Sequence, residues 1–176
     1  MRLFVAINFS ESTCRALAAL QVELRESARR GRFVAEENLH LTLAFLGACD
    51  VEQCKRAVRV VEDVCAVPFP IEITHLGRFR REDGDIWWAG IRESAPLREL
   101  QRDLTDKLCT AGFALENRPY TPHITLARQV VADAAEKTVS PFGETVVHIH
   151  LMESTHVGGK LIYTPVCEKG LAQVGG

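Results

Sequence analysis

The sequence predicts an α+β protein of two pseudo-symmetric lobes, each a mainly antiparallel sheet with helices on its outer face, with a central cleft between them. The phrase His-x-Thr-Leu-Ala occurs twice, at 40–44 and 123–127, in a chain of 176 residues. A shuffled chain of this composition should contain only about 0.004 copies of it. The predicted elements around both copies follow nearly the same order. We therefore expect residues 1–176 to form one bilobal domain with an internal repeat.

The first half predicts strands and helices in alternation. The expected elements are a strand at 3–9, a helix from Ser10 or Ser12 to about 28, the first motif strand at 39–46, a helix that begins at Asp50, and strands at 71–76 and 85–91. Apolar residues three and four apart define the inner faces of both helices, and Ser or Asp caps their starts. The basic run at 29–32 then falls at the end of the first helix.

The second half repeats this order with small changes. The expected elements are a helix from Ser94 to Gly112, the second motif strand at 121–128, a short helix at about 131–138, and strands at 145–152 and 161–167. Leucines at 97, 100, 104 and 108 repeat the spacing of the first helix. Pro119 and Pro122 favour an extended approach to the second motif.

The composition is that of an ordinary globular protein, with 47% hydrophobic and 25% charged residues. A net charge of −2 argues against bulk electrostatic coating of nucleic acid, so a polyanion would have to be bound locally. The six cysteines include no CxxC pair, and the apolar run at 3–9 is too short to span a membrane. We therefore expect a cytoplasmic monomer that makes no membrane contact.

The repeated motif predicts a site with two histidines. Because side chains alternate along a strand, His40 and Thr42 share one face, as do His123 and Thr125. A histidine pKa near 6.5 allows one copy to be neutral and the other protonated near pH 7, so the pair can act as general base and general acid. The threonine hydroxyls can donate hydrogen bonds to an anionic oxygen between them.

This layout suits in-line displacement at phosphorus, in which one histidine activates water and the other protonates the departing ribose oxygen. Neither a metal nor a cofactor is expected, because hydroxyl donors and a cation can meet the charge. Arg128 is the candidate cation, although strict alternation would turn it away from the cleft. Its role requires a bulge or the end of the strand at Ala127. Ala44 and Ala127 are expected on the cleft face, where they would leave room for a ligand.

The segments 39–43 and 121–128 resemble the paired motifs of the 2H phosphoesterases, specifically the bacterial RNA 2′,3′-cyclic phosphodiesterases, also known as 2′-5′ RNA ligases. The likeness extends to 2–7 and to 151–154 with Tyr163. It implies a bilobal hydrolase that opens a 2′,3′-cyclic phosphate to a 2′-phosphomonoester without a metal, with reversible 2′-5′ RNA ligation as an accessory activity. It also implies that His40 is the proton donor and His123 the proton acceptor.

The resemblance makes RNA or oligonucleotide 2′,3′-cyclic phosphate ends the expected partners, with small cyclic nucleotides as alternative substrates. Phe33 and Tyr120 are candidates for stacking on a base, with core packing as the other interpretation. The arginine runs at 29–32 and 78–81 could guide RNA phosphates or form a solvated surface.

Three other interpretations stay open at this point. A non-catalytic nucleotide or RNA-end binding module would retain the same cleft. His40 and His123 could instead be core histidines, a reading that the repetition disfavours. A metal-dependent hydrolase could use His148 and His150, which share a strand face, but the pattern supplies no third ligand.

Overall fold

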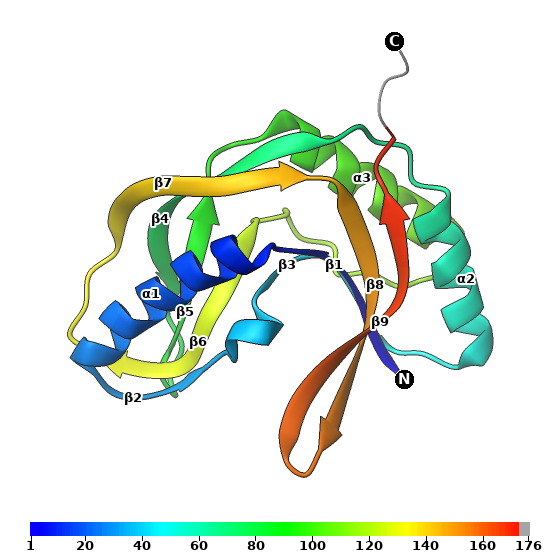
Figure 1. The fold of residues 1–176 in the computed structure, drawn as a ribbon. Coiled ribbons are helices and arrows are strands. Elements are labelled where there is room, and N and C mark those ends of the chain that lie inside the picture. The colour runs from blue at the N-terminus through cyan, green and yellow to red at the C-terminus, as the bar shows by residue number, and fades with distance from the viewer. Residues whose placement is uncertain (173–176) are drawn as a thin grey trace.

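The computed structural model describes residues 1–172, which form two sheets, three α-helices and a short 3₁₀ helix at Glu36–Asn38 (Figure 1). The first sheet has the strand order β3 (His40–Ala48), β1 (Arg2–Asn8), β8 (His148–Val157) and β9 (Lys160–Gly170). The second sheet has the order β2 (Ala28–Phe33), β6 (His123–Ala132), β5 (Asp85–Ile91), β4 (Phe69–Phe79) and β7 (Lys137–Val146). All pairings are antiparallel, which confirms the predicted fold class.

The two sheets do not correspond to the two halves of the sequence. The first sheet takes strands from both ends of the chain, because β1 pairs with β3 on one side and with β8 on the other. The second sheet takes β2 and the strands from β4 to β7. In both sheets, however, the motif strand pairs with an interior strand, β3 with β1 and β6 with β5. This shared pairing is the basis of the pseudo-symmetry of the lobes.

The helices are divided between the sheets. α1 (Glu11–Ser27) packs against β6 and β7 of the second sheet, whereas α2 (Val51–Glu62) and α3 (Ala95–Thr110) pack against the first (Figure 1). The buried helix leucines are Leu17 and Leu24 of α1, and Leu97, Leu100, Leu104 and Leu108 of α3. The apolar faces predicted from the leucine spacing are therefore the faces that contact the sheets.

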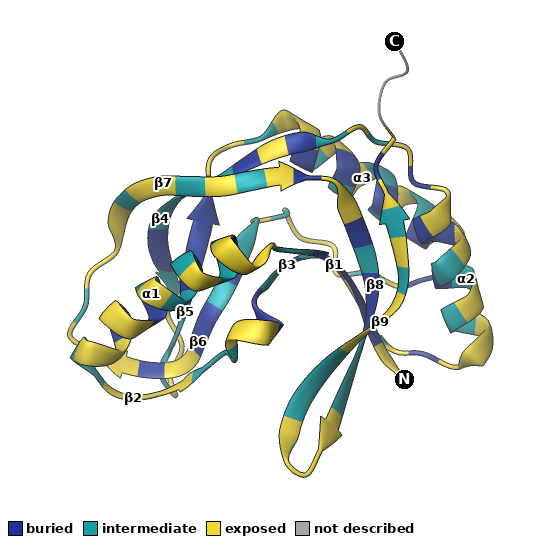
Figure 2. Ribbon diagram, viewed as in Figure 1, coloured by how far each residue is buried: buried dark blue, intermediate teal, exposed yellow. Residues whose placement is uncertain are grey.

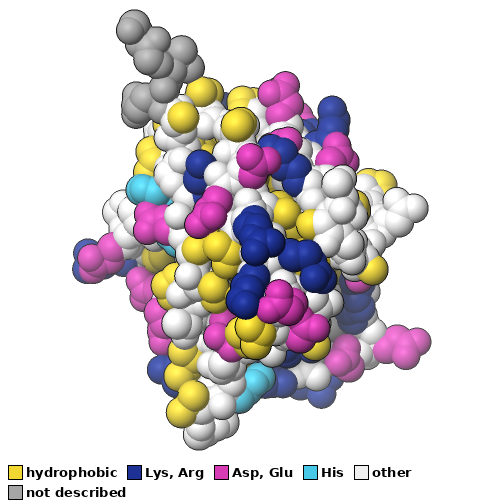
Figure 3. All heavy atoms as spheres, turned by 90° about the vertical axis from the view of Figure 1, so that its right-hand side faces the viewer, with side chains coloured by type: hydrophobic (Ala, Val, Ile, Leu, Met, Phe, Trp, Pro, Cys, Tyr) yellow, Lys and Arg dark blue, Asp and Glu magenta, His cyan; other side chains and the backbone are white. Residues whose placement is uncertain are grey.

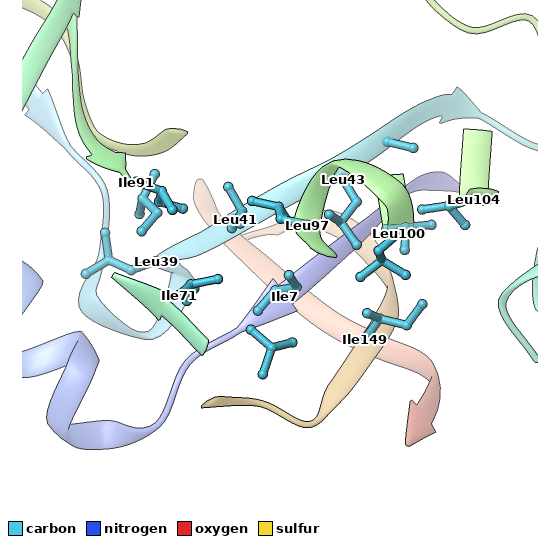
Figure 4. Packing of buried hydrophobic residues seen from close by; sticks show 14 of the residues in the cluster. Ile7, Leu39, Leu41, Leu43, Ile71, Ile91, Leu97, Leu100, Leu104 and Ile149 are labelled. Atoms are coloured by element: carbon cyan, nitrogen blue, oxygen red, sulfur yellow. The ribbon is translucent and has the colours of Figure 1, made fainter. Parts of the chain in front are cut away.

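The hydrophobic core is continuous across both sheets. Buried residues lie along the strands and on the inner faces of the helices (Figure 2). In the core, Ile7 and Leu41 of the first sheet lie near Ile71 of the second sheet and Leu97 of α3 (Figure 4). Burial of each such side chain contributes about 1.5–3 kcal/mol. The two sheets are thus held together as one packed unit.

One segment predicted to be helical is divided between two strands, and the basic run after the first helix forms a strand that was not predicted. The first helix ends at Ser27, close to the expected residue 28, and residues 28–33 form strand β2 at the edge of the second sheet. The region 131–138, expected to be a short helix, is divided between the end of β6 and the start of β7. Val130 and Val131 are good strand formers, and pairing with neighbouring strands satisfies the backbone in a way that an isolated short helix could not. The strand expected at 145–152 is likewise divided between β7 and β8.

The predicted helix starts are confirmed at Asp50 and Ser94. The Asp50 carboxylate accepts a hydrogen bond from the Gln53 backbone N–H at 2.7 Å, and the Gln53 side chain accepts from the Asp50 N–H at 2.8 Å. This reciprocal pair is a capping box. Ser94 Oγ accepts from the Leu97 N–H at 3.2 Å. Both side chains satisfy backbone donors that a helix start leaves unpaired.

Within residues 1–172, no helix is long and apolar enough to cross a bilayer. The six cysteines all lie in this region and none forms a disulfide.

Replacement of Asp50 by Ala should lower the free energy of unfolding by about 1 kcal/mol, because the first turn of α2 loses its cap. Urea unfolding followed by circular dichroism measures this change. Asp50→Asn, which keeps an acceptor oxygen, should retain most of the stability, and equal losses in both variants would contradict the capping role.

Candidate functional site

The two motif strands have the same burial pattern from residue to residue. In each, the histidine and threonine are partly exposed, the residue between them is buried, the following Leu and Ala are both buried, and the next residue is exposed. Two consecutive buried residues break the alternation of a regular strand. The exposed residue after them is Phe45 in β3 and Arg128 in β6.

A β-bulge in β6 accounts for this break. Between Thr125 and Ala127 the strand advances by two residues while its partner β5 advances by one, so Leu126 is the extra residue. A second irregularity follows Ala127, where Gln129 has a φ of 53°. Arg128 therefore faces the cavity described below rather than the core. From the sequence, Arg128 could face the cleft only if a bulge or the end of the strand occurred at Ala127, and the fold contains such a bulge.

The same bulge occurs in β3. The strand advances from Thr42 to Ala44 while β1 advances by one residue, which makes Leu43 the extra residue. The bulge overturns one expectation from strict alternation, namely that Ala127 lies on the cleft face, whereas Ala44 does line the cavity described below. Ala127 is fully buried and Ala44 is 7% exposed, and both belong to the hydrophobic core.

His40 is held at both ring nitrogens. Its Nδ1 lies 2.7 Å from the carbonyl oxygen of Asn38, and its Nε2 lies 2.8 Å from Thr42 Oγ1. A carbonyl only accepts, so Nδ1 carries the hydrogen and Nε2 of the neutral ring accepts from the threonine hydroxyl. The rings of Phe4 and Tyr163 pack against the imidazole, with centroids 4.9 Å and 5.3 Å away. These contacts leave the ring one orientation.

His123 is oriented in the same way by the backbone two residues before it. Its Nδ1 donates to the Thr121 carbonyl oxygen at 2.6 Å, which leaves the Nε2 lone pair as the basic position. The rings of Phe79 and Trp88 lie beside it, with centroids 5.1 Å and 6.2 Å from the imidazole. Gly77 makes room for the indole, because a Cβ there would lie 2.3 Å from the Trp88 ring.

Both imidazoles have a lowered pKa. Burial lowers the pKa of His40 and of His123 below the ordinary 6.5, and the positive charge of Arg128 lowers both further, while the hydrogen bond to the backbone raises each. His123 also lowers the pKa of His40 by charge repulsion. Both histidines are therefore neutral at pH 7 before a ligand binds, and the same arginine affects both.

A cavity of about 460 Å³ lies beside the two motifs. Its lining includes Thr42, His123, Thr125 and Arg128, whereas His40 is not among the described lining residues and is hydrogen-bonded to Thr42, which is. The other lining residues come from β3, β4, the loop between β4 and β5, β5, α3 and the segment before β6: Leu43, Ala44, Phe45, Phe79, Arg81, Ile86, Gln101, Thr105, Leu115, Glu116, Arg118, Pro119, Tyr120 and Thr121. Hydroxyl, imidazole and guanidinium donors thus converge on one space, as an anion requires.

The two aromatic candidates for base stacking lie in different surroundings. Tyr120 lines the cavity, but its hydroxyl donates to the Thr42 carbonyl oxygen at 2.8 Å, and burial raises its pKa. Phe33 is not among the residues that line the cavity in the described part of the chain. Its ring lies under the guanidinium of Arg25, 4.4 Å from the ring centroid. Stacking on either ring stays a prediction.

Sequence reasoning missed several residues that build the site. Asn38, which is buried, presents its carbonyl to His40 and donates from Nδ2 to the Leu161 carbonyl oxygen at 3.1 Å. Trp88 and Phe79 extend the aromatic surroundings of His123. One sequence signal was available, because Asn38 and Thr121 each stand two residues before a motif histidine.

His148 and His150 lie apart from this cavity. Nε2 of His148 is 3.0 Å from a carboxylate oxygen of Glu168, and Nε2 of His150 is 3.9 Å from the other. Among residues 1–172, no group of three His, Cys, Asp or Glu side chains is placed to hold a metal ion. The described fold therefore gives no third ligand to the metal-dependent alternative.

An antiparallel bilobal fold with one His-x-Thr motif in each lobe defines a protein of the 2H phosphoesterase type. The chain belongs to the 2′-5′ RNA ligase superfamily, whose family model matches residues 9–157.

Three similar proteins illustrate the relationship. A Methanocaldococcus jannaschii protein named RNA 2′,3′-cyclic phosphodiesterase is 30% identical over 178 residues, covering 96% of this chain and 99% of its own. A Geobacillus stearothermophilus protein of the same name is 34% identical over 169 residues, covering 86% of this chain but only 53% of its own. The crystal structure of Escherichia coli LigT complexed with 3′-AMP matches with a TM-score of 0.82 and 27% identity, covering 98% of both chains.

Replacement of Arg128 by Gln should raise the pKa of both His40 and His123 toward 6.5, because a positive charge near each ring is removed. Two-dimensional NMR of the imidazole Cε1–Hε1 signals against pH measures both values in one titration. A control titration of Arg59→Gln, on the outer side of the first sheet, should leave them unchanged. Unaltered histidine values in Arg128→Gln would show that this side chain does not face the motifs.

Proposed function

We propose that this protein hydrolyses RNA 2′,3′-cyclic phosphate ends to 2′-phosphomonoesters by two-histidine acid-base catalysis. The observation that carries the proposal is the convergence of Thr42, His123, Thr125 and Arg128 on one cavity, with His40 hydrogen-bonded to Thr42. Relatives at 30–34% identity are named RNA 2′,3′-cyclic phosphodiesterase, which supports the same reaction here.

In the proposed reaction His123 acts as the general base. Its Nε2 takes a proton from water while the water oxygen attacks phosphorus and the bond from phosphorus to O3′ breaks. His40 acts as the general acid, and its Nε2–H gives a proton to the departing O3′. One water is consumed, and a 2′-phosphate and a free 3′-hydroxyl are formed. A ribose 5′-hydroxyl in place of water would give a 2′-5′ linkage, which accounts for ligation as a reversible accessory activity.

The charged groups of the cavity prepare this division of roles. His40 must be protonated in the complex, although its pKa is lowered in the free protein. A bound phosphate anion counters the charge of Arg128 and raises the imidazole pKa, so substrate binding itself favours the acid form. Once Nε2 of His40 carries a proton it no longer accepts from the Thr42 hydroxyl, which is then free to donate to a phosphate oxygen. With Thr125 and Arg128 as further donors, no step needs a metal.

A row of arginines beside the cavity supports RNA rather than a free cyclic nucleotide as the substrate. Arg32 of β2 lies directly opposite Arg128 of β6, and residues opposite each other in a ladder share one face. Arg30, on the same strand, reaches across to donate to the Asp83 carbonyl oxygen at 3.2 Å. Arg81 lines the cavity and lies over the Phe79 ring. Together they offer phosphate contacts beyond the reacting group.

The face that carries α2 has a different charge pattern. There Lys and Arg side chains are mixed with Asp and Glu (Figure 3). Mixed charges of this kind favour a solvated surface over a track for a polyanion.

Replacement of His40 or His123 by Ala should lower kcat for a nucleoside 2′,3′-cyclic phosphate by about 100-fold or more, because each loss removes one proton transfer. Chromatography of the products measures both the rate and the position of the phosphate. His156→Ala, an exposed histidine on the β8–β9 hairpin, serves as the matched control and should retain normal turnover. Wild-type protein that binds a nucleoside 2′-phosphate but turns over no cyclic phosphate would instead identify a binding module.

Replacement of Arg32 by Gln should raise KM for an oligoribonucleotide that ends in a 2′,3′-cyclic phosphate, and weaken the dependence of KM on salt, because one phosphate contact is lost. The KM for a cyclic mononucleotide should change little. Arg59→Gln on α2 removes the same charge from the other face and controls for net charge. Equal effects of Arg32→Gln on long and short substrates would argue against the RNA path.

A further inference from the structure

Each bulge brings the carbonyl of its extra residue into contact with a glutamine side chain. In β6, the Leu126 carbonyl oxygen accepts from the Val34 backbone N–H at 2.9 Å and from Gln21 Nε2 of α1 at 2.9 Å. Gln21 Nε2 also donates to the Val34 carbonyl oxygen at 2.8 Å. One amide group thus joins the bulge of the second motif to the segment that leads into the first.

The other lobe has the corresponding contact. Gln101 Nε2 of α3 lies 3.4 Å from the carbonyl oxygen of Leu43, the extra residue of the β3 bulge. The two glutamines occupy the same place in the pattern Leu-x-x-Leu-Gln-x-x-Leu, at 17–24 and 97–104. The internal repeat therefore includes these glutamines as well as the motifs. Each glutamine lies on the helix that packs against its sheet, and it donates to the motif strand of that sheet.

The burial of Gln21 separates its role from direct substrate contact. Its side chain is 7% exposed and is not among the described residues that line the cavity. A buried amide is costly unless it is hydrogen-bonded, so these contacts are strongly favoured in the folded protein. The hydrogen bond from Gln21 holds Leu126, which lies between Thr125 and Arg128 in the strand.

We propose that Gln21 and Gln101 are positioning residues for the phosphate site. They hold the two bulges in place, and the bulge of β6 in turn directs Arg128 into the cavity. A small displacement of a positioned group is enough to reduce a rate by a large factor. This inference rests on the proposed function for its kinetic readout.

A double-mutant cycle of Gln21→Met and Arg128→Gln tests the proposal, with kcat and KM measured for a nucleoside 2′,3′-cyclic phosphate. Methionine keeps the length of the side chain without its donors. Leu24→Ala is the matched control, because it removes buried packing from the same helix and leaves the Leu126 carbonyl bonded. All rates are compared at a temperature where each variant is folded by circular dichroism.

Gln21→Met should lower kcat by about 10-fold or more, whereas Leu24→Ala should stay within about two-fold of wild type after correction for the folded fraction. Arg128→Gln should lower kcat by a much smaller factor in the Gln21→Met background than in the wild-type background, because the guanidinium is already misplaced. Single effects that multiply in the double variant, or a wild-type kcat in Gln21→Met, would overturn the proposal, since a role in stability alone leaves the contribution of Arg128 intact.

Two further arms keep the test decisive. If Gln21→Met does not fold, the parallel cycle of Gln101→Met with Thr42→Val applies the same criterion to α3, where the amide is only partly buried. If wild-type protein turns over no cyclic phosphate, the proposed function fails separately. The original cycle is then measured as affinity for inorganic phosphate by calorimetry, where coupling supports the positioning role and additivity overturns it.

Discussion

The alternation of side chains along a β-strand is the constraint on which this site depends. A regular strand could place His123 and Thr125 on the cleft face, but it would turn Arg128 into the core. The bulge at Leu126 resets the alternation by one residue, so three polar side chains face the cavity. The irregular backbone of β6 costs free energy, and one part of this cost is the positive φ of Gln129, of order 1–2 kcal/mol for a residue with a side chain. Packing of the neighbouring buried residues offsets it.

Arg128 links binding to the protonation of the histidines in the proposed reaction. Before a ligand binds, burial and this guanidinium keep both imidazoles neutral, so neither ring repels the other. A base is then ready at His123, while the acid at His40 is created only when an anion offsets the arginine. The two motifs are nearly identical in sequence, and in the proposed reaction their roles diverge because different groups surround them. His40 has its threonine at hydrogen-bond distance, whereas His123 lies among larger aromatic rings.

The features of this protein that could be predicted from the sequence are those marked by repeated residue patterns. The duplicated motif located the paired strands, and leucine spacing located the inner faces of α1 and α3. Bulges could not be predicted, because one extra residue in a strand leaves no mark in the pattern itself. The helix predicted at 131–138 is wrong for a related reason, since pairing of its first residues with β2 and of its last residues with β4 outweighs local helix preference. Asn38 and Gln21 were missed because a buried amide is recognised only by the carbonyls it meets.

The crossing of the chain between the sheets makes each half of the sequence dependent on the other. The interior strand β1 needs β8 from the far end of the chain, and the motif strand β6 is covered by a helix from the first half. Neither half contains a complete sheet or a complete core. The two histidines, separated by nearly half of the chain in sequence, are therefore expected to become ordered in a single cooperative step of folding. A chain released before its last two strands would carry both motifs and still lack an assembled site.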